Sequence, residues 1–224
     1  MIIAIDGPAA SGKSTTAKIV GEKLNFLYID TGAMYRAMTL KVKNSGVDFT
    51  DRKGIVDLIS STKISQTIDE DSGLTKTFLD GEDVSNFIRT PEISRGVGSV
   101  CEIFEVREAL VKLQREMGNS CDVILDGRDI GTVVFPNADL KFWMVADVDI
   151  RASRRYEEMK EKNPSLTIED VKNDLIERDR RDSERLNSPM KPADDAIFID
   201  TSNYSISEQA DLIVSEVLKL KSRL

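Results

Sequence analysis

Five short apolar segments recur along the chain, at residues 2–5, 26–29, 123–125, 140–146 and 196–199. Several of them are continuous rather than alternating, which is typical of strands that are buried on both faces. Helix-like segments separate the five, and this alternation indicates a parallel sheet with right-handed crossovers. Four of the segments run into an acidic residue, namely Asp6, Asp30, Asp126 and Asp200. We therefore predict an α/β fold in which carboxylates stand at the ends of strands.

Residues 63–84 follow a different pattern, with a rough alternation of polar and apolar positions. Turn signals occur at Asp71-Ser72-Gly73 and at Asp80-Gly81. Short alternating runs separated by such turns predict a small antiparallel insert.

Two further segments carry the signals of helix starts. Thr90 followed by Pro91 predicts a helix, with Thr as the N-cap and Pro in the first turn. The spacing Ser205-x-x-Glu208 predicts a capping box before a C-terminal helix. The first of these helices has an apolar face that comprises Ile93, Val97, Val100 and Phe104.

The length of 224 residues, 40% of them hydrophobic, suits one domain that carries smaller inserts. No apolar run approaches the ~20 residues of a membrane span. The acid at position 6 comes too early for a signal peptide. We therefore expect a cytoplasmic protein.

The chain has 31 Lys and Arg, 39 Asp and Glu and no His, which gives a net charge of −8. This acidic balance argues against wrapping a nucleic-acid polymer, but it allows a local basic pocket for a small anion. The absence of His excludes a Ser-His-Asp triad, a His metal site and an imidazole general base. Any catalysis must therefore proceed without His.

Residues 7–14 read GPAASGKS and match the phosphate-binding pattern G-x-x-x-x-G-K-[ST], between a predicted strand and a predicted helix. Glycines let the backbone turn tightly and direct N–H groups at phosphate oxygens, and the helix N-terminus adds its dipole. Lys13 supplies a charge for the β- and γ-phosphates, and the Ser14 hydroxyl a ligand for Mg²⁺. The predicted ATP site comprises Gly7, Pro8, Ala9, Ala10, Ser11, Gly12, Lys13, Ser14 and Thr15.

Motifs that the sequence lacks exclude several classes of phosphate-loop protein. The N-K-x-D motif with which GTPases read guanine does not occur. Large motor and helicase ATPases need more chain and additional arginine motifs. A small kinase that phosphorylates a small acceptor fits the length best.

Two polar clusters follow predicted strands, whose carboxyl ends border the ligand crevice of an open α/β sheet. Residues 30–36 read DTGAMYR, and residues 126–131 read DGRDIG. Asp126 resembles the acid that holds Mg²⁺ directly or through water, and Arg128 is suited to bind a phosphate through two hydrogen bonds. For Arg36, a surface salt bridge is the alternative.

Residues 167–186 predict a helix with one face that begins apolar and becomes charged. By their spacing, this face comprises Ile168, Val171 and Leu175 and continues through Arg178, Asp182 and Arg185. An inward charged patch needs an ionic partner to offset its desolvation, and a nucleotide would provide one. The alternative is an internal ladder of Arg–Asp pairs along the helix.

Arg151, Arg154 and Arg155 open a charged stretch, residues 151–164, which we predict to be a mobile flap. Arginines there would clamp a transferring phosphoryl group as the flap closes. The alternative is a solvated helix face.

Taken together, these stretches resemble the bacterial cytidylate kinases, which phosphorylate CMP and dCMP with ATP. The matching stretches are IDGPAASGKST, DTGAMYRA, GEDVSNFIRTPEIS, VREAL, DGRDIGTVVFP and ERDRRDSER, in the family's order from residue 3 to residue 185. Many families share the phosphate loop, whereas DGRDIGTVVFP and the insert that ends in GEDVSNFIRT are much more specific.

The resemblance implies a P-loop fold of adenylate-kinase type, with a five-stranded parallel sheet flanked by helices. It implies a single kinase domain over residues 1–224. The implied parts are a core (1–30, 100–150 and 166–224), an acceptor-binding subdomain (about 31–99, with a β insert at about 63–88) and a short lid (about 151–165).

The resemblance also implies residue roles. Arg36 and Arg128 would bind the acceptor phosphate. Arg107, Arg185 and Ser99 would read the cytosine, and Arg178 and Asp182 would contact the sugar. The implied catalytic residues are Lys13, Arg128, Arg154 and Arg155. The implied CMP site comprises Thr31, Arg36, Ser99, Arg107, Arg128, Asp129, Arg178, Asp182 and Arg185, and the implied Mg²⁺ site Ser14 and Asp126.

The expected reaction converts ATP and CMP, or dCMP, to ADP and CDP, or dCDP. The attacking phosphate oxygen is anionic at neutral pH, so no general base is needed. The alternatives are another small acceptor, UMP, AMP or shikimate, or a non-catalytic ATP-dependent regulatory protein. We expect a monomer that binds neither a nucleic-acid polymer nor a membrane.

Overall fold

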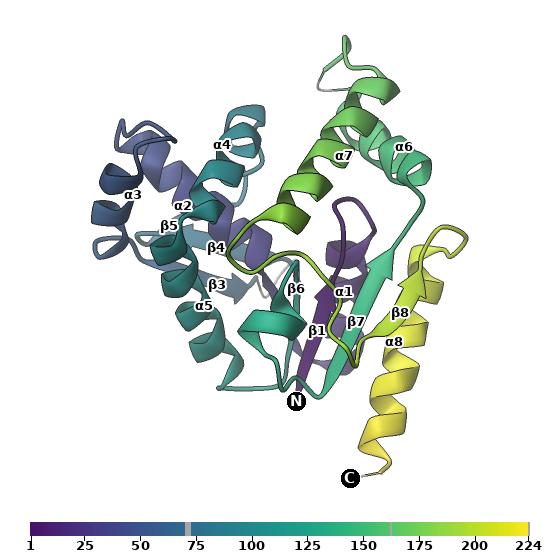
Figure 1. Cartoon of the computed structure of the whole chain (residues 1–224). Coiled ribbons are helices and arrows are strands. Elements are labelled where there is room, and N and C mark those ends of the chain that lie inside the picture. Colours follow the sequence, from purple (N-terminus) through teal and green to yellow (C-terminus); the bar gives the residue numbers. More distant parts are fainter. Residues whose placement is uncertain (70–72, 162, 224) are drawn as a thin grey trace. The chain divides into compact units, whose positions relative to one another are not determined.

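The computed structural model describes residues 1–69, 73–161 and 163–223 (Figure 1). The chain divides into two compact units. The first unit combines residues 1–26 with residues 122–224, and the second is Leu27–Cys121. The chain thus leaves the first unit after its first helix and returns to it for the rest of the sheet.

A five-stranded sheet organises the fold, with strand order β2-β6-β1-β7-β8. The pairs β1–β6, β1–β7 and β7–β8 are all parallel. The central strands are buried on both faces, as their continuous apolar sequences predict. The strands are β1 (Ile2–Asp6), β2 (Leu27–Asp30), β6 (Val123–Gly127), β7 (Leu140–Val145) and β8 (Ile197–Asp200). All five predicted strands and the parallel sheet are confirmed.

Helices of the first unit flank these strands, and two of them, α1 and α8, pack against each other. A further two, α6 and α7, also pack together. The Ser205–Glu208 capping box predicted for the last helix is present. The helices are α1 (Lys13–Leu24), α6 (Val148–Met159), α7 (Ile168–Glu184) and α8 (Ile206–Lys221), with a π-helical turn at Ile130–Val134.

The second unit contains a small antiparallel sheet beside helices. Its strands pair in the order β3-β4-β5, with Ile64 opposite Leu79, so the predicted antiparallel insert is confirmed. Asp80 and Gly81 both have positive φ, as a tight hairpin turn requires. Asp71 and Ser72 of the other predicted turn lie outside the described residues. The elements are α2 (Thr31–Asn44), α3 (Arg52–Ile59), β3 (Ile64–Ile68), β4 (Thr75–Leu79), β5 (Glu82–Asp83), α4 (Pro91–Glu102) and α5 (Phe104–Gly118).

The helix predicted at Thr90 and Pro91 begins there, with the Thr90 side chain accepting a hydrogen bond from Ile93 N. Including Phe104 in its apolar face is wrong. The extended backbone of Ile103 ends α4 and starts α5, so the helical phase is interrupted before Phe104. Phe104 is 52% exposed, whereas Ile93, Val97 and Val100 are buried.

The predicted face of residues 167–186 fails at its first position. Val171 and Leu175 are buried on α7, but Ile168, in the first turn of the helix, is 48% exposed. Arg185 caps the C-terminus with φ −59 and ψ 140, so the chain leaves the helix only after it. Its guanidinium lies 3.7 Å from Asp182 Oδ1, three residues earlier on the predicted face.

Residues 151–159 of the predicted flap are helical as part of α6. The Asp147 side chain accepts a hydrogen bond from Asp149 N and caps this helix. Lys162, within the expected lid, lies outside the described residues. Across the described ranges, no helix is both long and apolar enough to cross a membrane.

Candidate nucleotide site

The phosphate loop lies between the end of β1 and the start of α1. Gly7 has φ +146, and a Cβ there would lie 2.0 Å from Met144 O. Gly12 has φ +93, a conformation that glycine adopts without strain. Among the described residues no side chain caps the N-terminus of α1. Its N–H groups and its dipole therefore form an anion site of the kind that holds phosphates.

Lys13 lies inside the loop with 4% of its surface exposed. Its ammonium donates hydrogen bonds to Pro8 O at 2.6 Å and to Ser11 Oγ at 3.2 Å. Burial, and next the positive charge of Arg128, hold the pKa of Lys13 well below its ordinary value. The nearby negative charges do not balance the positive charge of Lys13 and the loss of its hydration, so a polyanionic ligand would stabilise the charged form.

Ser14 and Asp126 bring two oxygens together. Ser14 Oγ donates a hydrogen bond to Asp126 Oδ2 at 2.7 Å, which joins the first turn of α1 to the end of β6. Mg²⁺ in phosphotransfer sites takes only one or two protein oxygens and completes its shell with water and phosphate. This hydroxyl–carboxylate pair fits that donor set.

Asp6, at the end of β1, holds the segment that follows β6. Its two carboxylate oxygens accept hydrogen bonds from Ile130 N at 2.9 Å and from Gly131 N at 2.7 Å. Burial raises the pKa of Asp6 to about 6, against the lowering effect of these two bonds. The sequence pattern predicts Asp6 only as a strand-end acid, and its pairing with the turn at Ile130–Val134 has no sequence signal.

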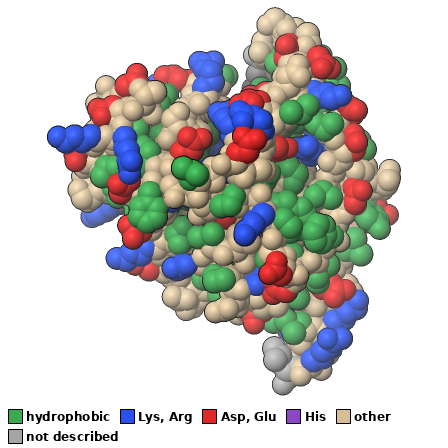
Figure 2. Space-filling model, viewed as in Figure 1, with side chains coloured by type: hydrophobic (Ala, Val, Ile, Leu, Met, Phe, Trp, Pro, Cys, Tyr) green, Lys and Arg blue, Asp and Glu red, His purple; other side chains and the backbone are tan. Residues whose placement is uncertain are grey.

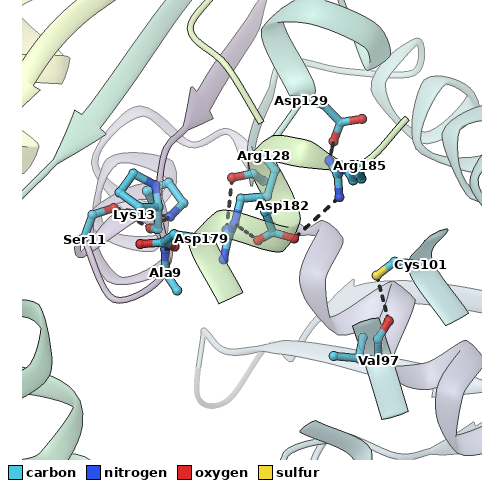
Figure 3. A network of polar contacts seen from close by, with 12 residues as sticks. Ala9, Ser11, Lys13, Val97, Cys101, Arg128, Asp129, Asp179, Asp182 and Arg185 are labelled. Atoms are coloured by element: carbon cyan, nitrogen blue, oxygen red, sulfur yellow. Dashed lines mark hydrogen bonds and ion pairs between the residues drawn. The ribbon is translucent and has the colours of Figure 1, made fainter. Parts of the chain in front are cut away.

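A cluster of paired charges surrounds the C-terminal end of α7 (Figure 3). Arg128 Nε donates to Asp182 Oδ2 at 2.9 Å. The Arg185 guanidinium lies 3.5 Å from Asp129 Oδ1 and 3.7 Å from Asp182 Oδ1. The structure thus brings together Arg128, Asp129, Asp182 and Arg185, four of the residues predicted for the acceptor.

The electrostatics of this cluster favour full ionisation. Burial would raise the pKa of Asp182, but the positive charges of the arginines, Arg128 first and then Arg178 and Arg185, lower it. Burial would likewise lower the pKa of Arg128, but the charge and hydrogen bond of Asp182 outweigh it and raise that pKa. In the space-filling view, basic and acidic side chains accordingly lie side by side over α7 (Figure 2).

Arg185 retains donor capacity inside this cluster. Its side chain is only 7% exposed. Its Nε donates to Ser188 O at 2.5 Å, while Nη2, which lies 3.5 Å from Asp129 Oδ1, makes no hydrogen bond within the described part of the chain. A buried guanidinium N–H without an acceptor is costly, and a ligand oxygen or ring nitrogen would satisfy it.

The three arginines of the predicted flap have different surroundings. Arg151 is buried, and its guanidinium pairs with Asp179. Arg154 donates to Thr201 O at 2.7 Å and to Thr201 Oγ1 at 3.2 Å. Arg155 pairs with Glu158 in the next turn of α6.

In the second unit, the cluster after β2 caps a helix and orients an arginine. Asp30 is the N-cap of α2; its side chain accepts a hydrogen bond from Ala33 N and pairs with Arg89. Thr31, the first residue of α2, is buried. Arg36, one turn further, donates to Ser94 Oγ at 2.9 Å.

Arg107 is 4% exposed on α5 and lies over the ring of Tyr35, with 5.3 Å from Cζ to the ring centroid. It also donates to Cys101 O at 3.3 Å. Ser99 is exposed on α4. The second unit thus holds four predicted acceptor residues, Thr31, Arg36, Ser99 and Arg107, and the first unit holds all the others.

Comparison with known proteins places the chain in a family. The cytidylate kinase family model matches residues 3–219. The chain is 46% identical to a cytidylate kinase of Lactobacillus johnsonii, over 100% of this chain and 96% of that protein. It is 47% identical to a cytidylate kinase of Bacillus subtilis, over 99% of this chain and 97% of that protein.

Solved structures share the fold at low sequence identity. An uncharacterized protein from Eubacterium ventriosum is 12% identical, with a TM-score of 0.53 over 97% of this chain and 98% of that one. A gluconokinase from Sinorhizobium meliloti is 11% identical, with a TM-score of 0.50 over 99% of this chain and 93% of that one. At this identity the likeness concerns the fold alone. Because the family model and these relatives cover essentially the whole length, the chain belongs to the cytidylate kinase family.

Proposed function

We propose that the protein transfers the γ-phosphate of ATP to CMP or dCMP and releases ADP and CDP or dCDP. Membership of the cytidylate kinase family supports this reaction. The observation that carries it at the level of residues is the buried Arg185 Nη2, which lies 3.5 Å from Asp129 Oδ1 but makes no hydrogen bond to the described atoms, in a charged cluster on the unit that holds the phosphate loop. A nucleotide acceptor supplies the missing polar partner.

In this proposal the phosphate loop, residues 7–15, binds the triphosphate of ATP. Lys13 and the N-terminus of α1 neutralise the β- and γ-phosphates. Lys13 would exchange its bond with Pro8 O for phosphate oxygens. The approach of these anions would raise its pKa again.

Mg²⁺ would be held by Ser14 and Asp126, directly or through water, and would supply charge neutralisation between the β- and γ-phosphates when bound. The 2.7 Å hydrogen bond between the two side chains supports this assignment, because it holds both oxygens close together. The remaining ligands would be water and phosphate oxygens.

We assign each of the acceptor residues a role. Arg36 and Arg128 would bind the phosphate of CMP, with Thr31 nearby in sequence to Arg36. Arg107, Arg185 and Ser99 would recognise the cytosine. Arg178, Asp182 and Asp129 would contact or support the sugar. Arg154 and Arg155 would clamp the transferring phosphoryl group.

The chemistry requires alignment and charge neutralisation rather than proton abstraction. The attacking oxygen belongs to a phosphate that is ionised at neutral pH, and the chain has no His. Lys13 and the arginines act where charge spreads over the equatorial oxygens in the transition state. Exclusion of water from the bound phosphates would prevent hydrolysis of ATP.

A panel of acceptors tests the proposal. ADP release is measured with CMP, dCMP, UMP, AMP and shikimate at matched concentrations, with CDP or dCDP identified as product. We expect transfer to CMP and dCMP well above the others. Preference for AMP, UMP or shikimate would reassign the acceptor, and slow hydrolysis unaffected by any of them would indicate an ATP-dependent regulatory protein.

Localisation and oligomeric state form a separate part of the proposal. We further propose that the protein acts as a cytoplasmic monomer.

A further inference from the structure

Ala9 of the phosphate loop is held at both ends of its backbone by side chains from α6 and α7. Its N–H donates a hydrogen bond to Asp179 Oδ1 at 3.0 Å. Its carbonyl accepts one from Arg151 Nη1 at 3.1 Å. Figure 3 shows the Asp179 carboxylate directed at the loop. Neither side chain has a role in the proposed reaction.

The two side chains also pair with each other. Arg151 Nη1 donates to Asp179 Oδ2 at 2.5 Å, and the two side chains are 9% and 17% exposed. Arg151 Nε donates in addition to Ala146 O, just after β7, at 3.0 Å. The ion pair therefore joins α6, α7, the end of β7 and the phosphate loop through one guanidinium and one carboxylate.

Apolar contacts reinforce this connection. The methyl group of Ala9 belongs to a buried cluster with Ala152 of α6 and with Val171 and Leu175 of α7. The apolar face of α7 thus packs on the phosphate loop itself. Ala9 is only 4% exposed, so its side chain and both of its backbone groups are all in contact with the α6–α7 pair.

The position of Asp179 on α7 gives this contact a consequence. Arg178 precedes it, and Asp182, one turn further, pairs with Arg128. Burial lowers the pKa of Arg128, and the negative charge of Asp179 helps to raise it, after the larger effect of Asp182. One helix therefore carries both the contact to the phosphate loop and the residues assigned to the acceptor.

We propose that the Arg151–Asp179 pair positions the phosphate loop relative to the acceptor-binding end of α7, so that occupancy of the acceptor site is transmitted to the loop at Ala9. Arg151 and Asp179 are positioning residues, because they touch the loop backbone and not the reacting atoms. This inference rests on the proposed function. Misplacement of reacting groups by about 1 Å is enough to lower turnover about 100-fold, so loosening this contact would affect turnover more than substrate affinity.

Variants at position 179 test the proposal. Asp179→Ala removes both the acceptor for Ala9 N–H and the charge opposite Arg151. Asp179→Asn keeps an amide oxygen that can accept from Ala9 N–H and loses the charge. Glu177→Gln is the control, since Glu177 lies on the exposed side of the same helix and pairs only with Arg180 and Arg181 among the described residues.

We expect Asp179→Ala to lower kcat about 100-fold and Asp179→Asn about 10-fold, with the KM for CMP and for ATP changed less than threefold. Glu177→Gln should match the unmodified protein. A purely structural ion pair predicts a lower melting temperature with normal kcat for the folded fraction, and that result would overturn the proposal.

A second measurement reads the connection directly. In ¹⁵N-labelled protein, CMP added without ATP should shift the amide resonance of Ala9. The shift should be lost in Asp179→Ala, retained in part in Asp179→Asn and unchanged in Glu177→Gln. An equal Ala9 shift in Asp179→Ala, or none in the unmodified protein when CMP binds, would overturn the proposal. Failure of the unmodified protein to phosphorylate CMP, measured first, would instead refute the proposed function.

Discussion

The hydroxyl of Ser14 donates a hydrogen bond to Oδ2 of Asp126 across 2.7 Å. The two residues lie 112 positions apart in the chain and meet because α1 and β6 belong to the same unit. A hydroxyl and a carboxylate at this distance can share one divalent cation. The dependence of turnover on Mg²⁺ is therefore the most direct chemical test of the proposed ATP-binding site.

Asp126→Asn should lower turnover and shift the Mg²⁺ requirement to higher concentration, because the amide keeps the hydrogen bond to Ser14 but removes the charge. We expect turnover to fall about 10- to 100-fold at fixed Mg²⁺. The measurement is turnover against Mg²⁺ concentration. Asp200→Asn, an exposed acid at the end of β8, is the control. A Mg²⁺ curve identical to that of the unmodified protein would remove Asp126 from the metal site.

Lys13→Met should abolish transfer while the fold survives. The ammonium group neutralises negative charge on the phosphates, so we expect turnover to fall at least about 100-fold. Because burial lowers the pKa of Lys13, its charged form is disfavoured in the folded protein, and an apolar side chain of similar length should keep or raise the melting temperature. Lys18→Met, on the exposed side of α1, should leave both quantities unchanged. Near-normal turnover of folded Lys13→Met would contradict the assignment.

Asp6→Asn should reveal that the contribution of Asp6 to stability falls as pH rises, which is the opposite of the usual behaviour of a carboxylate. The pKa of Asp6 is raised to about 6 from 3.8, so the folded protein binds its proton more tightly than the unfolded chain. The stabilisation from Asp6 is therefore greatest below about pH 4 and declines as pH rises to about 6. Two units correspond to at most about 3 kcal/mol.

The destabilisation caused by Asp6→Asn should accordingly be larger at pH 4 than at pH 7, when the free energy of unfolding is measured by denaturant titration. Asp200→Asn is again the control, because the hydrogen bonds from Ser202 lower the pKa of Asp200. The contribution of Asp200 to the free energy of unfolding therefore rises with pH. A cost of Asp6→Asn that is constant or rises with pH would show that folding does not raise the pKa of Asp6.

The strands and the phosphate loop were predictable because each depends on local sequence. Continuous apolar runs specify strands that are buried on both faces, and the glycines of the loop satisfy steric needs that the structure displays at Gly7. The capping residues Thr90 and Ser205 act on the N–H groups of their own helices. Such signals are present in any short window of the chain.

The rest depended on partners distant in sequence. Arg151 was identified as part of a basic group, but its burial follows from Asp179 and from two carbonyl groups, Ala9 O and Ala146 O. Asp6 lies 124 residues from Ile130 N. Helical spacing placed Arg185 beside Asp182, as the structure has it, but its pairing with Asp129 depends on a residue that is distant in sequence. Spacing alone contains none of these long-range contacts.

Arg154→Ala and Arg155→Ala should both lower turnover, although the two side chains have different surroundings. The Arg154 guanidinium is held by Thr201, whereas Arg155 pairs only with Glu158 among the described residues, a weak i,i+3 contact that is easily exchanged for a ligand. If both clamp the phosphoryl group, each substitution should lower kcat about 10-fold or more with KM for CMP unchanged. The measurement is kcat and KM for both substrates. A weaker KM for CMP with intact turnover would contradict the clamp, and a lower melting temperature of Arg154→Ala alone would indicate that Arg154 anchors Thr201.

Arg185→Ala should weaken the binding of CMP and leave the affinity for ATP nearly unchanged. The Arg185 side chain is 7% exposed, and its Nη2 lies 3.5 Å from Asp129 Oδ1 without a hydrogen bond to any described atom. A hydrogen bond from a charged donor is worth roughly 1.5–3 kcal/mol, so the Kd for CMP should rise about 10- to 150-fold. Calorimetric titration with CMP and with an unreactive ATP analogue measures both affinities.

The same substitution separates recognition from scaffolding through the stability of the free protein. Arg128 continues to compensate Asp182 when Arg185 is removed, so we expect only a small change in melting temperature. Arg180→Ala is the control, because its ion pairs with Glu177 and Glu184 lie on the exposed side of α7. It should leave CMP affinity unchanged. A clear drop in the melting temperature of Arg185→Ala with unchanged CMP affinity would show that the charged end of α7 is an internal ion-pair ladder, and the acceptor would then have to bind elsewhere.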